Sequence, residues 1–352
     1  MINVTLSKNL KKKPAEDKLK FGKNFTDHMF LMDYSTEKGW HDARIVPYAP
    51  FTLEPSALVL HYAQEIFEGL KAFKDDNDNI TMFRPRENFA RMNRSADRLC
   101  IPNFDVDVVM EGLTELIKLE KDWIPKSEGT ALYVRPFIIA TDPYLGVKVA
   151  ENFIFCIILS PVGAYYANGF APVSLYVENE YTRAADGGTG EVKCGGNYAC
   201  SLIAGNKAKK MGYDQVLWLD SKYKKNIEEV GSMNMFVVIN GEVLTASLDG
   251  TILPGITRKS IIQILKDEGY KVTERKISVD EIITALENGK FDEAFGTGTA
   301  AVVSPVGKLC YNDKEYIVGD GKTGKITQML YDRLTGIQKG KYADKYNWLY
   351  KI

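Results

Sequence analysis

The dipeptide Asn240-Gly241 constrains the fold of this chain more than any other short stretch, because it lies between two apolar runs. Asn-Gly accepts the positive φ angles of a tight two-residue turn, and such turns join antiparallel strands. The flanking runs, Ser232–Ile239 and Glu242–Thr245, are therefore predicted to form a β-hairpin. The apolar run Gln215–Asp220 before them is predicted to be a buried strand.

The first half of the chain carries both strand and helix signals. An Asp/Asn-rich loop over 75–79 joins two short apolar runs, which predicts a second hairpin. Apolar residues recur at helical spacing after Pro85 and again from Asp107. The predicted elements are strands over 69–73, 80–83, 131–139 and 153–159, and helices over 87–99 and 107–118.

With 352 residues, the chain is long enough for two domains that each bury a core of their own. The run rich in Gly, Ala, Pro and Tyr that follows Pro161 is the best candidate for their connection. We therefore expect a small N-terminal domain over 1–165, a linker over 166–180 and a large C-terminal domain over 181–352 that carries Lys193.

Composition narrows the classes of function. A formal net charge of -1 gives no basic field for nucleic acid, and no stretch approaches the roughly 18 apolar residues of a membrane span. The five cysteines are odd in number and include no CxxC pair, which is typical of free thiols in a reducing compartment. A cytoplasmic location is therefore expected. Only three histidines are present, which argues against a histidine-rich metal site and a Ser-His-Asp triad.

The stretch Glu191–Cys200 is the best candidate for an active site, because it places Lys193 beside two glycines and ahead of Tyr198. Here an irregular segment turns into a helix, which Asn197 is predicted to cap and which should run to Met211. A lysine amine in a dry pocket can lose its proton, form a Schiff base with a carbonyl and move protons. On these residues alone, a solvated lysine in a glycine turn is the alternative.

Three arginines on the helix over 87–99 form a candidate anion site. Arg91, Arg94 and Arg98 recur at helical spacing. A guanidinium fork suits a phosphate, although arginines that simply face water fit the same pattern.

Two segments of the second half are further candidates for binding a phosphate. The helix after Pro254-Gly255 opens on Ile256–Lys259 without an acidic residue, so an anion at its first-turn amides would complement the helix dipole. The run Gly296–Ala301 offers flexible backbone and two hydroxyls. A third glycine run, Gly319–Lys325, nearly matches a P-loop. Because Ile326 stands where the Mg²⁺-binding Ser or Thr belongs, we expect only a turn before a helix.

Charged residues also occur in apolar surroundings. Tyr133 and Arg135 share one face of the strand over 131–139, and an arginine there calls for a carboxylate from a substrate or from the protein. Glu229 precedes the Asn-Gly hairpin, where strand pairing would turn its carboxylate inward. A solvated Glu228-Glu229 pair is the alternative.

Together these residues describe pyridoxal phosphate chemistry: a lysine for a Schiff base, a nearby tyrosine, a carboxylate for the pyridine nitrogen and anion sites for one phosphate. At this point the sequence resembles the branched-chain aminotransferases among the fold-type IV pyridoxal phosphate enzymes, from about Phe21 to Gln338. The resemblance is carried by ordered blocks: Phe25–His28, His61-Tyr62, Phe67–Gly69, Phe83–Pro85, Tyr133–Pro136, Lys193–Tyr198, Glu229–Gly231, Leu253–Arg258 and Gly298–Ala300. It implies a two-domain α/β (α+β) fold with mixed sheets, a barrel-like core and flanking helices.

The resemblance also implies a role for each candidate residue. Lys193 would carry the Schiff base and move the proton between the substrate carbon and the cofactor. Tyr198 would bond the ring oxygen of the cofactor, and Glu229 would keep its pyridine nitrogen protonated. The phosphate would be held by Arg91, the amides of Ile256 and Thr257, and Thr299. The substrate pocket would be lined by Tyr62, Tyr133, Arg135, Ala300 and Phe21.

The implied reaction is a ping-pong amino transfer from leucine, isoleucine or valine to 2-oxoglutarate, giving the branched-chain 2-oxo acid and glutamate. One pocket must then admit an aliphatic side chain and a second carboxylate, and Arg135 is the candidate to receive that carboxylate. A homodimer in which Tyr133 reaches the neighbouring subunit's site is also implied. The alternatives are a D-amino acid aminotransferase or an aminodeoxychorismate lyase of the same fold, and a phosphate-ligand binding protein without catalysis.

The sequence departs from the family pattern at two points. Mammalian members carry a CxxC thiol switch after the Gly-Thr-Ala motif, where this chain has Ala301 and Ser304, so no such redox control is expected. Ser232 replaces the usual threonine after Glu-Val-Gly and keeps the hydroxyl.

Overall fold

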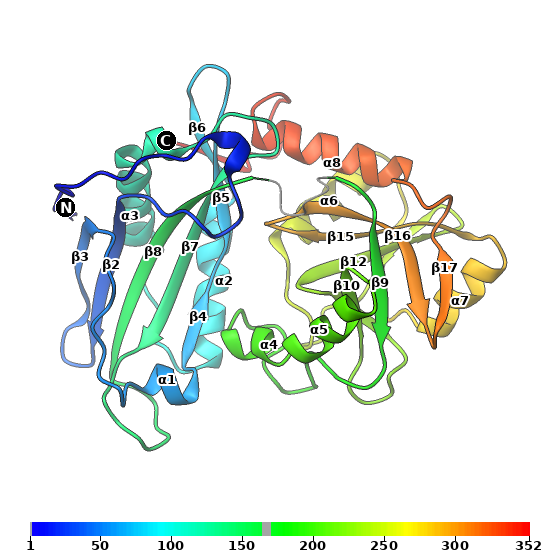
Figure 1. The fold of residues 1–352 in the computed structure, drawn as a ribbon, viewed down its shortest axis with the longest axis horizontal. Helices are drawn as coiled ribbons and strands as arrows, with labels where there is room; N and C mark the ends of the chain where they lie inside the picture. Colours follow the sequence, from blue (N-terminus) through cyan, green and yellow to red (C-terminus); the bar gives the residue numbers. More distant parts are fainter. Residues whose placement is uncertain (1, 164–169) are drawn as a thin grey trace. The chain divides into compact units, whose positions relative to one another are not determined.

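The computed structural model describes residues 2–163 and 170–352 (Figure 1). The chain forms two compact units. The first unit consists of Met1–Tyr165, Val192–Gly195 and Ile337–Ile352, and the second consists of Tyr166–Glu191 and Gly196–Gly336. Within the described ranges, no helix is long and apolar enough to cross a membrane.

The first unit is built on one mixed sheet of nine strands in the part of the chain that the structure describes. The strand order is β1-β3-β2-β8-β7-β5-β6-β18, and β4 pairs with β7. The predicted hairpin over 69–83 is confirmed, because β5 and β6 pair antiparallel with Ala72 opposite Met82. The strands are β1 (Asn3–Val4), β2 (His28–Ser35), β3 (Gly39–Pro47), β4 (Glu65–Phe67), β5 (Leu70–Lys74), β6 (Ile80–Phe83), β7 (Ala131–Ala140), β8 (Asn152–Val162) and β18 (Leu349–Lys351).

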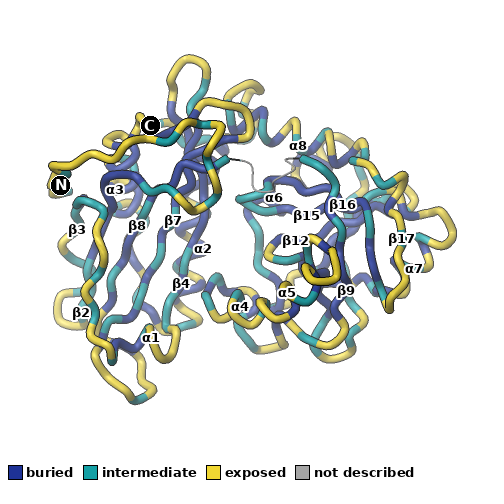
Figure 2. The backbone as a smooth tube through the Cα atoms, viewed as in Figure 1, coloured by how far each residue is buried: buried dark blue, intermediate teal, exposed yellow. Residues whose placement is uncertain are grey.

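Both helices predicted for this half are present, as α2 (Pro85–Arg98) and α3 (Val106–Leu119). Pro85 stands in the first turn of α2, where its missing N–H costs nothing, and the Asp105 side chain caps α3. Phe89, Met92 and Ala96 recur at helical spacing on α2 and are fully buried. In Figure 2, the buried residues of the chain, including those of α2, are drawn in dark blue. Short helices α1 (Leu58–Tyr62), η1 (Glu16–Lys18) and η2 (Lys121–Trp123) complete the unit.

The second unit is built around a closed barrel. Among the described residues, six strands pair in the order β11-β10-β9-β16-β15-β12, and β12 pairs back onto β11. Three more strands, β13, β14 and β17, extend this sheet. The predicted mixed sheets and barrel-like core are therefore confirmed. The strands are β9 (Val173–Glu178), β10 (Gln215–Leu219), β11 (Ile227–Val230), β12 (Met233–Ile239), β13 (Glu242–Thr245), β14 (Val272–Glu274), β15 (Phe291–Gly298), β16 (Val302–Tyr311) and β17 (Lys314–Ile317).

The Asn-Gly turn forms as predicted. Asn240 and Gly241 have φ angles of 50° and 74°, the positive values that a two-residue turn requires, and β12 and β13 pair antiparallel on either side of it. The helices of this unit are α5 (Leu202–Lys210), α6 (Ile256–Asp267) and α7 (Val279–Glu287), together with α4 (Gly195–Ala199) and α8 (Lys325–Gln338), of which Gly195 and the end from Ile337 belong to the first unit.

The prediction that Asn197 caps one helix reaching Met211 is wrong. The segment forms two short helices, α4 and α5, and Asn197 lies inside the first of them. Its side-chain amide donates to the carbonyl oxygen of Thr189 at 2.7 Å and accepts from the Thr189 hydroxyl at 2.8 Å. The amide is therefore used to hold the preceding loop rather than a helix terminus.

The domain boundaries also differ from the prediction. The predicted linker over 166–180 contains β9, which pairs on both sides within the barrel, so 173–178 is not a connector; residues 166–169 lie outside the described residues. The segment Val192–Gly195 and the C-terminal residues from Ile337 belong to the first unit, although the predicted C-terminal domain included both. Strand pairing explains the second difference, since β18 pairs with β6.

The Glu293 carboxylate, which lies at the start of α8, excludes the P-loop alternative. Both carboxylate oxygens of Glu293 accept backbone N–H groups there, from Ile326 and Thr327 at 2.9 Å each. A carboxylate thus occupies the position that a bound phosphate would need. The glycine run before α8 is a turn, as predicted.

Candidate active site

The segment around Lys193 is irregular and leads into α4, as predicted. Its backbone is fixed on both sides within the first unit: the Lys193 N–H donates to Ser95 Oγ at 3.2 Å, and the Phe67 N–H donates to the Lys193 carbonyl oxygen at 2.9 Å. The neighbouring side chains of Val192 and Cys194 are 3% and 5% exposed. The backbone that carries Lys193 is therefore ordered, and the side chains on either side of it are shielded from water.

The amine of Lys193 lies against an aromatic ring that it shares with Arg135. Lys193 Nζ is 4.9 Å from the centroid of the Phe67 ring, and Arg135 Cζ is 4.8 Å from the same centroid. An aromatic face attracts a cation while it excludes water. Phe67 thus links the candidate catalytic lysine to a residue of the predicted substrate pocket.

Arg135 is held by aromatic contacts and not by an acid. Its Nη2 donates to the Tyr133 hydroxyl at 3.3 Å, and its Cζ lies 5.3 Å from the centroid of the Tyr133 ring. Within residues 2–163 and 170–352, no ion pair joins Arg135 to a carboxylate, and its buried Nε has no hydrogen-bond partner. A half-buried guanidinium that forms no ion pair within the described residues can pair with an external carboxylate.

Two other predicted pocket residues behave differently from each other. The ring of Phe21 packs edge-on against Tyr133 with the centroids 4.9 Å apart, so Phe21, Tyr133 and Arg135 form one cluster. Gly69 leaves space for the Tyr133 side chain, since a Cβ at residue 69 would overlap the Tyr133 hydroxyl. Tyr62 is 41% exposed, and its hydroxyl donates to the carbonyl oxygen of Leu145. The structure thus does not bring the Tyr62 hydroxyl into the cluster.

Arg91, the predicted phosphate ligand of the first unit, has an acidic partner that the sequence did not suggest. Its Nε and Nη2 donate to the two oxygens of Glu68 at 2.7 and 2.9 Å, and both side chains are buried. Burial alone would raise the pKa of Glu68, but Arg91 and the charge of Lys193 hold it below its usual value. The Glu68 carboxylate is therefore charged, and it interacts electrostatically with Lys193. Arg94 and Arg98 are exposed, as the solvated alternative required.

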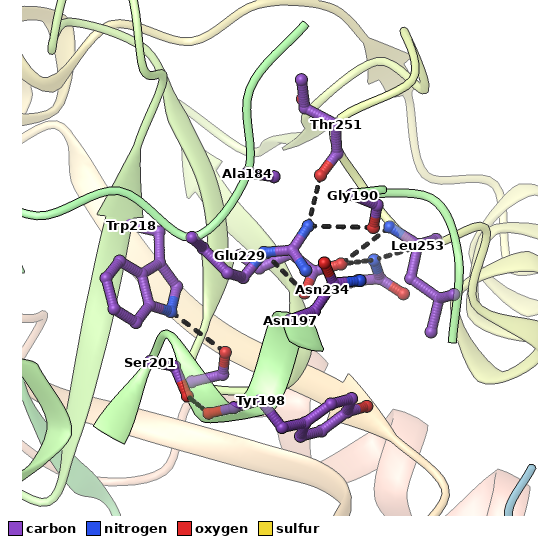
Figure 3. A network of polar contacts seen from close by, with 12 residues as sticks. Ala184, Gly190, Asn197, Tyr198, Ser201, Trp218, Glu229, Asn234, Thr251 and Leu253 are labelled. Atoms are coloured by element: carbon purple, nitrogen blue, oxygen red, sulfur yellow. Dashed lines mark hydrogen bonds and ion pairs between the residues drawn. The ribbon is translucent and has the colours of Figure 1, made fainter. Parts of the chain in front are cut away.

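Glu229 is buried in the second unit, which excludes the interpretation as a solvated acidic pair. It is 4% exposed on β11, opposite Asn234 of β12. Its Oε1 accepts the Leu253 N–H at 2.9 Å and the Asn234 amide at 3.4 Å, as Figure 3 shows. The hydrogen bonds from these donors fix the orientation of the carboxylate.

Arg183 is a member of this network that sequence reasoning missed. Its Nε lies 3.4 Å from Glu229 Oε2, and its Nη2 donates to the carbonyl oxygens of Gly190 and Thr251. The arginine therefore ties the carboxylate to two loops of the second unit. No local pattern marks Arg183, because its partners are separated from it in sequence.

The start of α6 has the features of an anion site. Gly255 stands at the N-cap without a side-chain hydrogen bond, and the first turn contains no acidic residue. Ile256 and Thr257 are 9% and 7% exposed. By contrast, α3 and α7 are capped by side chains. A buried and uncapped N-terminus leaves amide donors that a phosphate can accept from.

The first half of the predicted glycine-rich phosphate loop is strand. Residues 296–298 belong to β15, and Thr299 and Ala300 lie in the turn that leads to β16. Just before the turn, Thr297 is 1% exposed and, among the described residues, its buried hydroxyl has no hydrogen-bond partner. Such a hydroxyl fits an acceptor from a ligand. Tyr198 lies on α4, where its carbonyl oxygen accepts the Ser201 hydroxyl at 2.7 Å (Figure 3).

Glu228 is a buried acid on the other face of β11. It is 5% exposed and lines a cavity of about 50 Å³, and its Oε2 has no hydrogen-bond partner within the described part of the chain. Burial raises the pKa of Glu228 to about 7, against opposing effects of Thr251 and Arg183. Glu228 therefore gains a proton near neutral pH, whereas the same carboxyl in an unfolded chain titrates at about 4.3.

Replacing Glu228 with glutamine should stabilise the protein at alkaline pH. Because the folded pKa is raised, the folded wild type binds more protons than the unfolded chain between about pH 4.3 and 7, so it loses stability as pH rises through this window. Glu228→Gln removes that loss of folding free energy, which is worth about 4 kcal/mol at most. Urea unfolding at pH 4 and pH 8 checks the effect, with the exposed Glu37→Gln as the control. Equal gains at both pH values would contradict it.

No group of three or more His, Cys, Asp or Glu side chains that could hold a metal ion occurs in the described residues.

Comparison with known proteins gives a consistent result. Residues 65–309 match the family model described as amino-transferase class IV. Branched-chain-amino-acid aminotransferase 2 of Bacillus subtilis (strain 168) is 54% identical over 351 residues, which cover 100% of this chain and 97% of the relative. The crystal structure of the Escherichia coli branched-chain amino acid aminotransferase shares 27% identity with a TM-score of 0.77, covering 92% of this chain and 98% of that chain. The branched-chain amino acid aminotransferase of T.th., complexed with N-(5'-phosphopyridoxyl)-L-glutamate, shares 26% identity with a TM-score of 0.75, covering 91% and 97%.

Proposed function

Because this chain belongs to the class IV aminotransferase family, we propose that it transfers the amino group of leucine, isoleucine or valine to 2-oxoglutarate. The products are the branched-chain 2-oxo acid and glutamate, and the two half-reactions follow a ping-pong order. Pyridoxal 5'-phosphate is the cofactor, and when bound it stabilises the negative charge that develops at the substrate carbon. The observation that carries the proposal is that two relatives named as a branched-chain-amino-acid aminotransferase and a branched-chain-amino-acid transaminase match 100% and 97% of this chain.

The roles of individual residues are part of the proposal. Lys193 attaches the cofactor and moves a proton at the substrate carbon, which is supported by its fixed backbone and dry surroundings. Glu229 keeps the pyridine nitrogen protonated, which is supported by its three polar partners. Tyr198 bonds the ring oxygen of the cofactor. The phosphate is held by the amides of Ile256 and Thr257, with Thr299 and Arg91, and the substrate contacts Phe21, Tyr62, Tyr133, Arg135 and Ala300.

Arg135→Gln should change the KM for 2-oxoglutarate much more than the KM for L-leucine. The guanidinium pairs with the second carboxylate of 2-oxoglutarate, while an aliphatic side chain needs only the aromatic faces around it. The loss of a charged hydrogen bond raises the KM for 2-oxoglutarate by about 10- to 100-fold, and the KM for L-leucine should change by less than about threefold. Steady-state kinetics with each substrate varied in turn measures both values, and Arg94→Gln on the exposed face of α2 is the control. Equal changes for both substrates would assign Arg135 to another role.

The substrate class is tested by comparing amino donors. The protein should turn over L-leucine, L-isoleucine and L-valine with 2-oxoglutarate. A D-amino acid aminotransferase would prefer D-alanine, and an aminodeoxychorismate lyase would show no amino transfer. Turnover of D-alanine alone, or no spectral sign of bound cofactor, would overturn the proposal. The relatives do not favour these alternatives.

Assembly and location are proposed on narrower grounds. We propose a homodimer, which sedimentation equilibrium tests through the mass of the particle. Contribution of Tyr133 to a neighbouring subunit is part of this proposal, although its ring also packs on Phe21 of its own chain. A cytoplasmic location is supported by the five cysteines, which are all free thiols.

A further inference from the structure

The segment that presents Lys193 is held from one side by a single strand of the first unit. The backbone N–H of Phe67, at the end of β4, donates to the Lys193 carbonyl oxygen at 2.9 Å. At the start of the same strand, Glu65 Oε1 accepts the backbone N–H of Gly195. Because both contacts arise on β4, the strand binds the chain at the lysine itself and again two residues later.

The contact to Gly195 comes from a side chain and is specific to this position. Glu65 is half-buried, and its carboxylate fills the space that a side chain at residue 195 would need: a Cβ on Gly195 would lie 2.5 Å from Glu65 Oε1. Gly195 is also the first residue of α4, so its N–H has no acceptor in the preceding turn of that helix. Glu65 supplies this acceptor.

The carboxylate is also in the field of Arg135. Burial raises the pKa of Glu65, and the Gly195 N–H and the Arg135 guanidinium oppose this by favouring the charged form. β4 pairs with β7, the strand that carries Arg135, with Phe67 opposite Phe137. One side chain of β4 therefore contacts the lysine segment while its charge acts on a residue of the proposed substrate pocket.

We propose that Glu65 is a positioning residue for Lys193, which fixes the course of the lysine segment by accepting the Gly195 N–H. This inference rests on the proposed function, because it assumes that Lys193 is the reacting amine. The physical basis is that a catalytic group displaced by about 1 Å can lose a factor of about 10² in rate. Glu65 touches neither substrate nor cofactor in this role.

The experiment compares three variants of the full-length protein with the wild type. Glu65→Gln keeps an oxygen acceptor and loses the charge, Glu65→Leu removes the acceptor at similar volume, and Glu111→Leu replaces an exposed acid on α3 as a control. Hydrogen–deuterium exchange of the peptide that contains Gly195, measured with and without pyridoxal 5'-phosphate, reads out the contact directly. Stopped-flow and steady-state kinetics with L-leucine read out its consequence.

Glu65→Leu should speed exchange at the Gly195 amide by about tenfold or more, since the acceptor is lost. It should lower kcat by about 10- to 100-fold, with less than about threefold change in the KM for L-leucine. Glu65→Gln should keep most of the exchange protection and lower kcat by less than about fivefold. Exchange and kcat equal to wild type in Glu65→Leu would overturn the positioning role.

Failure of this inference is distinguishable from failure of the proposed function. A wild type without transaminase activity would contradict the proposed function, while the exchange measurement would still report on the contact between Glu65 and the Gly195 N–H. A fully active wild type whose Glu65 variants all exchange and react normally would sink the inference alone. If Glu65→Leu does not fold, Glu65→Ala removes the same acceptor of the Gly195 N–H with a smaller side chain. Wild-type exchange at the Gly195 amide and a wild-type kcat in that variant would likewise overturn the positioning role.

Discussion

Lys193→Ala lowers kcat for amino transfer from L-leucine to 2-oxoglutarate by a factor on the order of 10⁴ or more. The variant lacks the amine that, in the proposed function, attaches the cofactor and moves the proton at the substrate carbon. The fold should persist, because the backbone bonds of residue 193 to Ser95 and Phe67 do not depend on its side chain. Steady-state rates, together with thermal unfolding of the same samples, separate loss of chemistry from loss of structure.

The control for this prediction is Lys210→Ala, which removes an exposed lysine of α5 and should leave the rate at the wild-type value. Added methylamine should restore part of the activity of Lys193→Ala, since a small free amine can replace the missing base in the space that the side chain leaves. A Lys193→Ala variant that retains more than about a tenth of the wild-type kcat would exclude the catalytic role.

Glu229→Gln should lower kcat by about 10²- to 10³-fold while the cofactor still binds. The amide keeps an oxygen that can accept the Leu253 N–H, but it lacks the charge that we propose keeps the pyridine nitrogen protonated. The change also breaks the buried ion pair between Arg183 and Glu229, which costs about 3–5 kcal/mol of folding free energy. Cofactor absorbance, the rate of the L-leucine half-reaction and urea unfolding measure the three effects separately.

Two variants make this test specific. Glu229→Asp keeps the charge on a shorter side chain and should fall between the wild type and Glu229→Gln. Glu228→Gln neutralises the adjacent acid, which is equally buried but lies on the other face of β11, and its rate should match the wild type. Equal losses of rate in Glu228→Gln and Glu229→Gln would mean that the region needs charge in general, and Glu229 would have no particular role.

Local patterns predicted the elements of the fold but not their grouping. Asn240-Gly241 predicted its hairpin because the turn needs only two residues with positive φ, and these are what the structure contains. The helix after Pro85 followed from the spacing of Phe89, Met92 and Ala96. By contrast, 173–178 was assigned to a linker, although it is a barrel strand, because its place depends on pairing with β10 and β16. The residues of a single segment do not indicate which strands it pairs with.

Residues of the candidate site were predictable where their chemistry is unusual for their surroundings. Lys193 between glycines and Arg135 in an apolar strand are of this kind. The residues that hold them were not predictable, because their partners are distant: Ser95 is 98 positions from Lys193, and Glu65 is 130 positions from Gly195. Arg91 shows the same limit from the other side. Its charge was recognised, but its buried partner Glu68 was not.

The shared Phe67 ring relates the two halves of the proposed reaction. Lys193 Nζ and Arg135 Cζ lie at 4.9 and 4.8 Å from its centroid. The ring therefore gives the Lys193 amine an apolar contact and packs against the Arg135 guanidinium. A leucine side chain can rest on such a surface, and the second carboxylate of 2-oxoglutarate can pair with Arg135. One wall of the first unit thus offers a surface suited to both substrates.

The most direct test of the central claim is borohydride reduction of the wild-type protein with bound pyridoxal 5'-phosphate, followed by mass spectrometry of its peptides. Reduction makes the link between the cofactor and its lysine permanent. The phosphopyridoxyl mass should appear on Lys193, and L-leucine added before borohydride should prevent the labelling. A label on any other lysine of the chain, or no label in a protein that transfers the amino group, would contradict the account.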